Sequence, residues 1–371
     1  MKILIQAQEL RNSLNKILTV IDKRNARPIL TNCLIVAEKN RLELIATDLE
    51  VTAKVMMNAD IDEAGSFCIN TKNIFDIVRE LPDEQLEIEI NQDKNILDLK
   101  CKNINYSLLI TSSDEYPQVN FDNSGNPFKL NSQNFSKIIA KTSHAISNDE
   151  TRINLNGIYM QELDSKLRTV AIDGHRLALL DLHNFNSGNT SLRDGVIIPR
   201  KGIVEIKKIA DSFEDADLTI SLDESFLYLN ANDEYFLSVR LIAREYPKYQ
   251  TVIPAKTSFT MKVDKESLLN AVKRIKILSN EKTNGIKLGV QAETLTISAN
   301  HPSLGHAKEE LPISYSGEEI EIGFNAKYMI ETLAVLENDE IIFEFNNELS
   351  PVICRSETEP DFLGIIMPLK L

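Results

Sequence analysis

Asp173, Gly174, His175 and Arg176 form a short polar corner inside an otherwise apolar, strand-like stretch. Asp173 and His175 are two positions apart, so their side chains would share one face of an extended strand. A carboxylate beside an imidazole is the pair that orients a general base in hydrolases. However, no serine or cysteine nucleophile motif, phosphate-binding glycine loop or dinucleotide motif accompanies the pair. We therefore predict that Asp173 accepts hydrogen bonds from backbone amides at a turn, with hydrolysis as the rival hypothesis.

Other residues capable of metal or redox chemistry are scattered along the chain. The four cysteines have no paired spacing, and the histidines other than His175 have no acidic or cysteine neighbours at ligand spacing. The sequence therefore predicts no metal, no cofactor and no enzymatic activity. The cysteines fit a reducing compartment, and the apolar runs are too short for a secretory or membrane-spanning segment. We expect a cytoplasmic protein with no membrane partner.

The corner has relatives near both ends of the chain. Asp48 lies 125 positions before Asp173, and Asn300 lies 127 positions after it. Two further anchors recur at similar intervals: a Glu-Tyr-Pro tripeptide and the lysine of a helix-like segment, as Lys72, Lys201 and Lys327. A chain of 371 residues is too long for one compact core. Three anchors with one period indicate a triplicated unit.

Each repeat is expected to open with a strand and an amphipathic helix, followed by four short strands, a second helix and three closing strands. This order predicts an α+β fold of three repeated domains, each with two helices packed on antiparallel sheets. The expected helices cover approximately residues 8–18, 71–80, 131–145, 200–210, 264–276 and 325–335. Turn-rich junctions predict domains at residues 1–122, 123–254 and 255–371.

The charge is distributed unevenly. The net charge of −14 taken alone argues against nucleic acid, yet the six helical segments together carry +8. Helix propensity does not explain this, because glutamate favours helices as lysine does and is not enriched in them. We expect a basic helical surface that contacts phosphates independently of base sequence. A repeat scaffold that binds only protein and never DNA is the alternative.

Three similar units in line would leave an unpaired sheet edge at each end of the chain. Head-to-tail pairing of two chains would remove both edges and close a six-domain dimeric ring. Such a ring would hold DNA by topology and would need little affinity for it.

Several motifs occur in order along the chain, among them Arg27-Pro-Ile-Leu-Thr-Asn32, Asp173-Gly-His-Arg-Leu177 and Met367-Pro-Leu-Lys-Leu371. With these motifs the chain resembles, from end to end, the bacterial DNA polymerase III beta subunit, the sliding clamp family. The resemblance implies the DNA clamp fold, a homodimeric ring around double-stranded DNA, and a processivity role in DNA replication. The implied partners are the replicative polymerase catalytic subunit, the clamp loader, and repair and translesion polymerases that carry clamp-binding motifs.

The resemblance also implies a cleft between the second and third domains that receives short peptide motifs, with the carboxy-terminal tail as part of it. Carried over residue by residue, the cleft comprises Leu155, Ile172, Gly174, His175, Arg176, Leu177, Pro247, Tyr249, Thr251, Val252, Pro351, Ile365, Met367, Pro368, Leu369, Lys370 and Leu371. Ile172 stands where the family often has threonine, and Thr251 where it often has arginine, so we expect an altered motif preference. On the residues alone, the apolar tail equally fits a packed core strand.

For DNA, the channel and loop positions of the family correspond to Arg24, Lys72, Asn148, Arg152 and Arg200. The charge of the helices adds Lys137, Lys141, Lys201, Lys207, Lys273 and Lys276. At the dimer interface, the family pairs the strand of Tyr106 and Leu108 with the helix end at Ile277 and Leu278 of the other protomer. Glu309 and Glu310 are expected to face Lys100 and Lys102 there.

Overall fold

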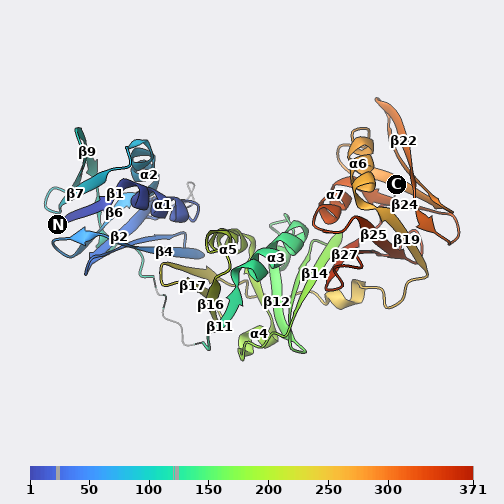
Figure 1. Cartoon of the computed structure of the whole chain (residues 1–371), viewed down its shortest axis with the longest axis horizontal. Helices are drawn as coiled ribbons and strands as arrows, with labels where there is room; N and C mark the ends of the chain where they lie inside the picture. Colours follow the sequence, from blue (N-terminus) through green and yellow to red (C-terminus); the bar gives the residue numbers. More distant parts are fainter. Residues whose placement is uncertain (22–25, 120, 122–124, 371) are drawn as a thin grey trace. The chain divides into compact units, whose positions relative to one another are not determined.

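The computed structural model describes residues 1–21, 26–119, 121 and 125–370. Its helices and strands confirm the predicted order in all three repeats (Figure 1). Among the described residues, the additions to that order are three two-residue strands, the five-residue helix α4 and five short 3₁₀ helices. The helix borders agree with the predicted ones to within a few residues, because strong amphipathic periodicity identifies helices well.

The first repeat contains β1 (Lys2–Gln6), α1 (Ala7–Leu18), β2 (Asn32–Glu38), β3 (Arg41–Thr47), β4 (Val51–Asn58), β5 (Asp60–Ile61), β6 (Gly65–Asn70), α2 (Thr71–Glu80), β7 (Gln85–Asn91), β8 (Ile96–Cys101), β9 (Ile104–Leu109) and β10 (Thr111–Ser112). The second contains β11 (Phe128–Asn131), α3 (Ser132–Thr142), β12 (Gly157–Leu163), β13 (Lys166–Ile172), β14 (Arg176–His183), α4 (Thr190–Asp194), β15 (Val196–Pro199), α5 (Arg200–Ser212), β16 (Asp217–Leu222), β17 (Phe226–Ala231) and β18 (Tyr235–Arg240). The third contains β19 (Phe259–Asp264), α6 (Lys265–Lys276), β20 (Gly285–Gln291), β21 (Thr294–His301), β22 (Gly305–Pro312), β23 (Ser314–Tyr315), β24 (Ile320–Asn325), α7 (Ala326–Ala334), β25 (Glu340–Phe345), β26 (Val352–Arg355) and β27 (Phe362–Ile366).

Polar caps set the start of several helices directly after a strand. Asn70, Asp264 and Asn325 each accept a hydrogen bond from a backbone N–H two or three residues later, at 3.0, 2.8 and 2.9 Å. Such a cap satisfies a backbone donor that the first helical turn leaves free. The strand and the helix can therefore join without a loop.

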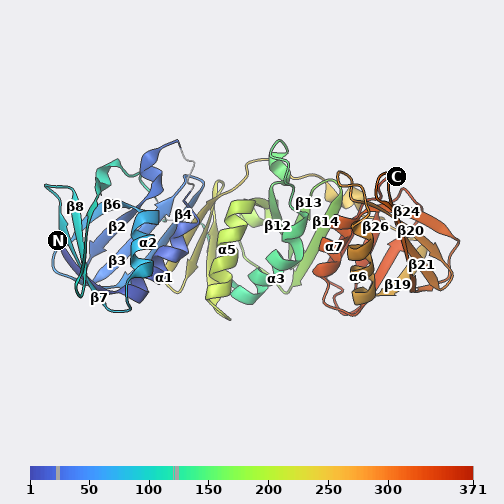
Figure 2. The ribbon, with the colours of Figure 1, turned by 90° about the horizontal axis from the view of Figure 1, so that it is seen from above.

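The first helices of the first and third repeats, α1 and α6, pack on the sheets of their own repeats. In α1 this face consists of Leu10, Leu14 and Ile17, which are buried at helical spacing. α1 contacts β3, β4 and α2, and α6 likewise contacts β21, β22 and α7. Figure 2 shows α1 beside α2 and α6 beside α7. These two pairs of helices thus each cover one face of antiparallel sheet, as the α+β prediction required.

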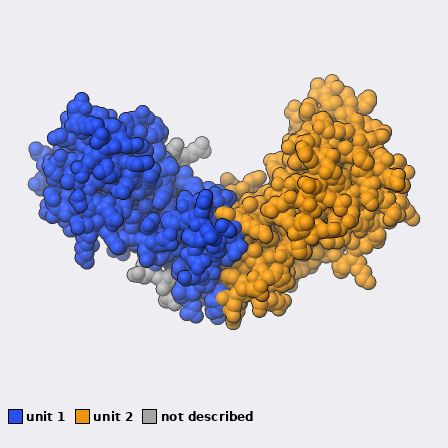
Figure 3. Space-filling model, in the orientation of Figure 1, with its two compact units in different colours: residues 1–135, 187–191, 201–241 blue, residues 136–186, 192–200, 242–371 orange. Residues whose placement is uncertain are grey.

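The chain packs as two compact units that divide the second repeat between them (Figure 3). Unit 1 comprises residues 1–135, 187–191 and 201–241, and unit 2 comprises residues 136–186, 192–200 and 242–371. Each unit contains a nine-stranded sheet built from two repeats, with the order β10-β6-β2-β3-β4-β18-β17-β16-β11 in unit 1 and β15-β12-β13-β14-β27-β26-β25-β19-β23 in unit 2. The repeat borders at 122 and 254 stay a prediction, because packing groups the strands differently.

The two nine-stranded sheets join their repeats in the same register. In unit 1, Thr52 of β4 lies opposite Ser238 of β18. In unit 2, Leu177 of β14 lies opposite Ile365 of β27. The remaining sheets have the orders β5-β1-β7-β8-β9 and β22-β21-β20-β24, so β9 and β22 are edge strands. β22 is the third-repeat equivalent of β4 and β14, and β9 is the first-repeat equivalent of β18 and β27.

Candidate partner-binding site and DNA-contacting residues

The Asp173 carboxylate closes the corner between β13 and β14. Its Oδ1 atom accepts hydrogen bonds from the backbone N–H groups of His175 (2.8 Å) and Arg176 (2.9 Å). Gly174 has a φ of +91°, a conformation that favours glycine. The predicted structural role of Asp173 is confirmed.

The two side chains that hydrolysis would need as a pair have other partners. The Oδ2 atom of Asp173 accepts a hydrogen bond from Arg176 Nε (3.1 Å). The His175 ring stacks on Tyr328 of α7, with centroids 5.6 Å apart and 19° between the ring planes. This arrangement does not orient His175 as a general base.

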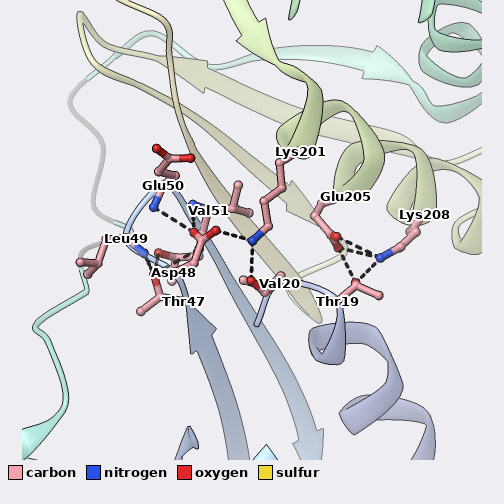
Figure 4. Close-up of polar contacts among 11 residues, drawn as sticks. Thr19, Val20, Thr47, Asp48, Leu49, Glu50, Val51, Lys201, Glu205 and Lys208 are labelled. Carbon is pink, nitrogen blue, oxygen red and sulfur yellow. Dashed lines mark hydrogen bonds and ion pairs between the residues drawn. The ribbon is translucent and has the colours of Figure 1, made fainter. Parts of the chain in front are cut away.

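The first repeat has the same corner between β3 and β4. Asp48 Oδ1 accepts hydrogen bonds from the backbone N–H groups of Glu50 (2.9 Å) and Val51 (2.7 Å). Asp48 Oδ2 is ion-paired with the ammonium of Lys201, which also donates to the Val20 carbonyl at 2.7 Å (Figure 4). Lys201 is thus held by the first repeat within unit 1.

A second polar contact lies beside the first (Figure 4). Glu205 of α5 is only 1% exposed. Its carboxylate accepts hydrogen bonds from Thr19 Oγ1 (3.1 Å) and Lys208 Nζ (2.9 Å). A buried carboxylate needs such a cation and such a donor. The Glu205–Thr19 hydrogen bond connects α5 to the end of α1, and the Lys201–Asp48 ion pair connects α5 to the β3–β4 corner.

The third repeat corrects our assignment of Asn300. Counted along the hairpin registers from the two-residue turns before β13 and β21, His301 and not Asn300 occupies the position of Asp173. His301 Nδ1 accepts a hydrogen bond from the Ser303 backbone N–H at 3.3 Å. The imidazole thus makes the bond that the carboxylate makes in the other repeats. Asn300 looked equivalent because it resembles aspartate chemically.

An apolar cluster with a half-buried rim adjoins the Asp173 corner in unit 2. Its buried members are Val170, Leu177, Leu179, Ile197, Tyr246, Tyr249, Ile353 and Ile365. Its half-buried members are Tyr159, Ile172, Ile242, Val252, Ile253 and Leu363. Five of the predicted cleft residues thus come together in this cluster, although they lie far apart in the sequence.

The carboxy-terminal tail runs beside the same corner. The backbone N–H of Met367 donates to the His175 carbonyl at 2.8 Å, and that of Leu369 donates to the Gly323 carbonyl at 2.7 Å. The tail is therefore held at two points by main-chain hydrogen bonds. The side chain of Met367 is half-buried.

The remaining predicted cleft residues differ in exposure: Leu155 is buried, Pro351, Pro368 and Leu369 are half-buried, Pro247, Thr251 and Lys370 are exposed, and Leu371 lies outside the described residues. The Thr251 hydroxyl donates to the Lys248 carbonyl at 2.8 Å, so it is engaged locally. Ile172 contributes apolar surface to the cluster rim. Ile172 is thus part of the apolar rim and Thr251 is exposed, and their effect on motif preference stays a prediction.

Arg176 is the most deeply placed charge at the corner, with 4% exposure. Its Nη1 atom is ion-paired with Glu331 of α7, and its guanidinium carbon lies 4.5 Å from the centroid of the Tyr328 ring. Burial, together with the charge of Arg176, lowers the pKa of His144 to about 3, so this imidazole is neutral at pH 7. Tyr328 and Glu331 were not among the predicted site residues. The sequence of one amphipathic helical turn does not indicate which residues will contact its polar face.

The predicted DNA-contacting residues have different surroundings. Several are ion-paired, namely Lys72 with Asp76 (2.6 Å), Lys207 with Asp211 (2.6 Å), Arg152 with Asp149 (3.1 Å) and Lys201 with Asp48. Lys137 and Lys273 are exposed and Lys276 is half-buried; within the described chain none of the three has an ion pair. Exposed pairs are weak, so they do not prevent a lysine from meeting a phosphate.

Arg200, the first residue of α5, and Asn148 were also predicted to contact DNA. Arg200 donates from Nη2 to the carbonyls of Ile146 (2.9 Å) and Ser147 (3.1 Å), and Asn148 is exposed. Arg24 lies outside the described residues.

Lys141 corrects another expectation. Its side chain is 2% exposed, and its ammonium donates to the Val335 carbonyl (2.6 Å) and forms ion pairs with Glu337 (3.1 Å) and Glu359. A buried ammonium with these partners cannot reach a phosphate. Counting charge along a helix misplaced Lys141, because it could not distinguish an inward-facing lysine from an exposed one.

The predicted interface residues lie on the edge strand β9 and directly after helix α6. Tyr106 of β9 is 37% exposed and Ile277, after α6, is 76% exposed, whereas Leu108 and Leu278 are half-buried. Leu109, which we did not predict, is 82% exposed. Of the charges expected to meet there, Glu309 already pairs with Arg274 (2.5 Å) in its own protomer.

In the described residues no histidine, cysteine, aspartate and glutamate side chains form a group that could hold a metal ion. Likewise, none of the helices that the structure describes is long and apolar enough to cross a membrane.

The similarity to known proteins extends over nearly the whole chain. Models of the DNA polymerase III beta subunit match in order: the N-terminal domain over residues 1–120, the central domain over 129–248 and the C-terminal domain over 250–370. The beta sliding clamp of Caulobacter vibrioides is 31% identical over 100% of both chains, and that of Pseudomonas aeruginosa is 30% identical over 99% of both.

Solved structures agree with these matches over the full length. The DNA polymerase sliding clamp from Pseudomonas aeruginosa, solved with a ligand, has a TM-score of 0.93 at 29% identity and 100% coverage of both chains. The sliding clamp from Bartonella birtlesii bound to griselimycin has a TM-score of 0.94 at 29% identity, also with 100% coverage of both chains. Because three domain models match in sequence order and full-length relatives agree, the chain belongs to the DNA polymerase III beta subunit family, the beta sliding clamps.

Proposed function

We propose that two copies of this chain close head to tail into a ring around duplex DNA and act as the processivity factor of a replicative polymerase. The observation that carries the proposal is the match of all three repeats, in order, to the three domains of a sliding clamp. The protein is a non-catalytic clamp, and the engaged side chains of Asp173 and His175 agree with that. DNA and polymerase as partners also suggest a cytoplasmic location.

The internal sheets support a specific register for the interface between protomers. β4 pairs with β18 and β14 pairs with β27, each joining one repeat to the next. The equivalent strands without such a partner in the described chain are the edge strands β22 and β9. An exposed edge is a template for pairing with another chain. We therefore propose that β22 of one protomer pairs antiparallel with β9 of its partner.

The register follows from the hairpins that contain these strands. His306 holds the place of Thr52 and Leu177, because each lies at the equivalent position of its hairpin. Ser107 holds the place of Ser238 and Ile365 in the same way. The proposed interface therefore sets His306 opposite Ser107 of the second copy.

The apolar cluster and the tail are the proposed site for partner peptides. Large apolar side chains meet there with a half-buried rim, next to the polar Asp173 corner. Such a mixture is typical of peptide and ligand sites. We propose that the replicative polymerase, the clamp loader and repair or translesion polymerases bind here in turn. A relative solved with griselimycin bound shows that a member of the family receives a ligand.

For DNA we propose contacts by the solvent-accessible cations and exclude Lys141. Lys137, Lys273 and Lys276 are the strongest candidates, followed by the exposed but engaged Arg152, Arg200 and Lys72. Lys201 and Lys207 are half-buried and ion-paired, so they would contribute mainly through the local field.

The test is topological. Protein placed on a nicked circular duplex by a clamp loader should remain bound in high salt and should dissociate once the circle is cut to a linear molecule. Release by salt from both forms would indicate ordinary electrostatic binding. No retention on either form, with polymerase peptides still bound, would favour the DNA-independent scaffold.

A further inference from the structure

A network of charges and rings connects the Asp173 corner to helix α7 in unit 2. Tyr328 and Glu331 are three residues apart on α7, so they lie on neighbouring turns of one helix face. Both contact Arg176: Glu331 through an ion pair and Tyr328 through its ring, 4.5 Å from the guanidinium carbon. Arg176 is therefore held from both sides of the junction between the second and third repeats.

Glu331 provides a second carboxylate, besides that of Asp173, for the Arg176 guanidinium. The Asp173 carboxylate already accepts two backbone hydrogen bonds at the corner, besides that from Arg176 Nε. Arg152 lies close to the corner as well, since its Nη1 atom would be 2.9 Å from a Cβ atom added at Gly174. A buried guanidinium needs compensating partners, and Arg176 has two, the carboxylates of Asp173 and Glu331.

The position of Arg176 decides that of the neighbouring rings. The guanidinium faces the Tyr328 ring at the distance of a cation–π contact, and Tyr328 stacks on His175. The His175 carbonyl in turn accepts the hydrogen bond from Met367 that holds the tail. A single chain of contacts thus runs from Glu331 to the tail.

We infer that Glu331 is a positioning residue for partner-peptide recognition: through Arg176 it holds the Tyr328 and His175 rings at the corner whose His175 carbonyl binds the tail. The inference rests on the proposed peptide site. Glu331 itself need not touch the peptide. Its effect is to keep one wall of that site in a single arrangement, which lowers the ordering cost of binding.

The experiment compares full-length variants for binding of a fluorescein-labelled peptide that carries the clamp-binding motif of the polymerase catalytic subunit. Glu331→Gln keeps the shape and removes the charge, and should weaken binding about five- to tenfold, a typical coupling between contacting residues. Lys327→Gln is the matched control, because it removes an exposed charge from the same helix, and should bind as the wild type does.

A double-mutant cycle separates positioning from general destabilisation. If Glu331 acts through Tyr328, then Glu331→Gln should weaken binding no further in a Tyr328→Ala background. The inference would be overturned if the losses of affinity caused by Glu331→Gln and Tyr328→Ala multiplied in the double variant. It would also be overturned if Glu331→Gln bound the peptide as tightly as the wild type does. Tm and gel filtration show whether Glu331→Gln folds. If it does not, Glu331→Asp must fold and bind the peptide with an affinity within about twofold of the wild type. A Glu331→Asp variant that fails to do so would also overturn the inference.

The outcomes distinguish this inference from the proposed function. No peptide binding by the wild-type protein would refute the peptide site itself. Wild-type binding that is lost on deletion of residues 367–371 but unchanged in Glu331→Gln would refute the role of Glu331 alone.

Discussion

One position of the first helix in each repeat is a long cation, occupied by Lys16, Lys141 and Arg274. Each has a different partner. Lys16 lies over the rings of Phe213 and Tyr235, at 5.4 and 6.0 Å, Lys141 is buried among carboxylates, and Arg274 pairs with Glu309 on β22. The shared position thus has three different partners: Lys16 and Lys141 connect neighbouring repeats, whereas Arg274 pairs within its own repeat.

Lys141→Ala should destabilise the protein because it leaves the carboxylate of Glu359 without its buried cation. Loss of one partner from a buried pair typically costs about 3 kcal/mol of unfolding free energy. Lys137→Ala, on the exposed face of the same helix, should change the unfolding free energy by less than about 0.5 kcal/mol. Urea unfolding followed by circular dichroism measures both. Equal stability of the two variants would contradict the buried placement of Lys141.

Among the elements, the edge strands determine how copies of the chain can join. β9 exposes Tyr106 and Leu109, and β22 carries charged residues such as Lys308 and Glu310. Charges on an edge strand discourage unspecific pairing. The register of the internal junctions then selects one pairing among those that remain.

A cysteine at His306 and another at Ser107 should form a disulfide between protomers. Residues directly opposite in antiparallel strands have Cα atoms about 4.5–5.5 Å apart, within the range of a disulfide. The native cysteines, Cys33, Cys68, Cys101 and Cys354, are all buried and should not interfere. Non-reducing gel electrophoresis after mild oxidation detects the cross-linked dimer. The off-register pair of His306→Cys with Tyr106→Cys is the control, and efficient cross-linking of that pair would disprove the register.

For the whole molecule, a ring needs interfaces that are absent from the single chain. Ile277 is 76% exposed at the end of α6, a high value for an isoleucine. An exposed apolar residue contributes little to the stability of one protomer. Its burial in an assembly would favour association.

Replacing Ile277 and Leu278 together by alanine should give monomers that keep the stability and the peptide affinity of the wild-type protomer. The reason is that Ile277 is exposed and Leu278 half-buried, so the protomer loses little buried apolar surface, and the proposed peptide site uses other residues. Analytical ultracentrifugation reports the oligomeric state, and retention on nicked circles should fall to the level of linear DNA. A stable dimer in the double variant would place the interface elsewhere.

Local patterns predicted much of the fold. Hairpin spacing, amphipathic helices and polar caps act over a few residues, so the element order and the amide-binding role of Asp173 could be read from the chain. The sequence motifs also identified the family. The charge count was less successful, because it treated Lys141 as equivalent to Lys137.

Contacts between distant segments could be seen only in the folded chain. Asp48 and Lys201 are separated by 153 positions, and Arg176 and Glu331 by 155. The pairing of β4 with β18 and of β14 with β27 brings these segments together. Whether a cation stays free for DNA depends on which carboxylate tertiary packing places beside it, and that information is not local to any stretch of sequence.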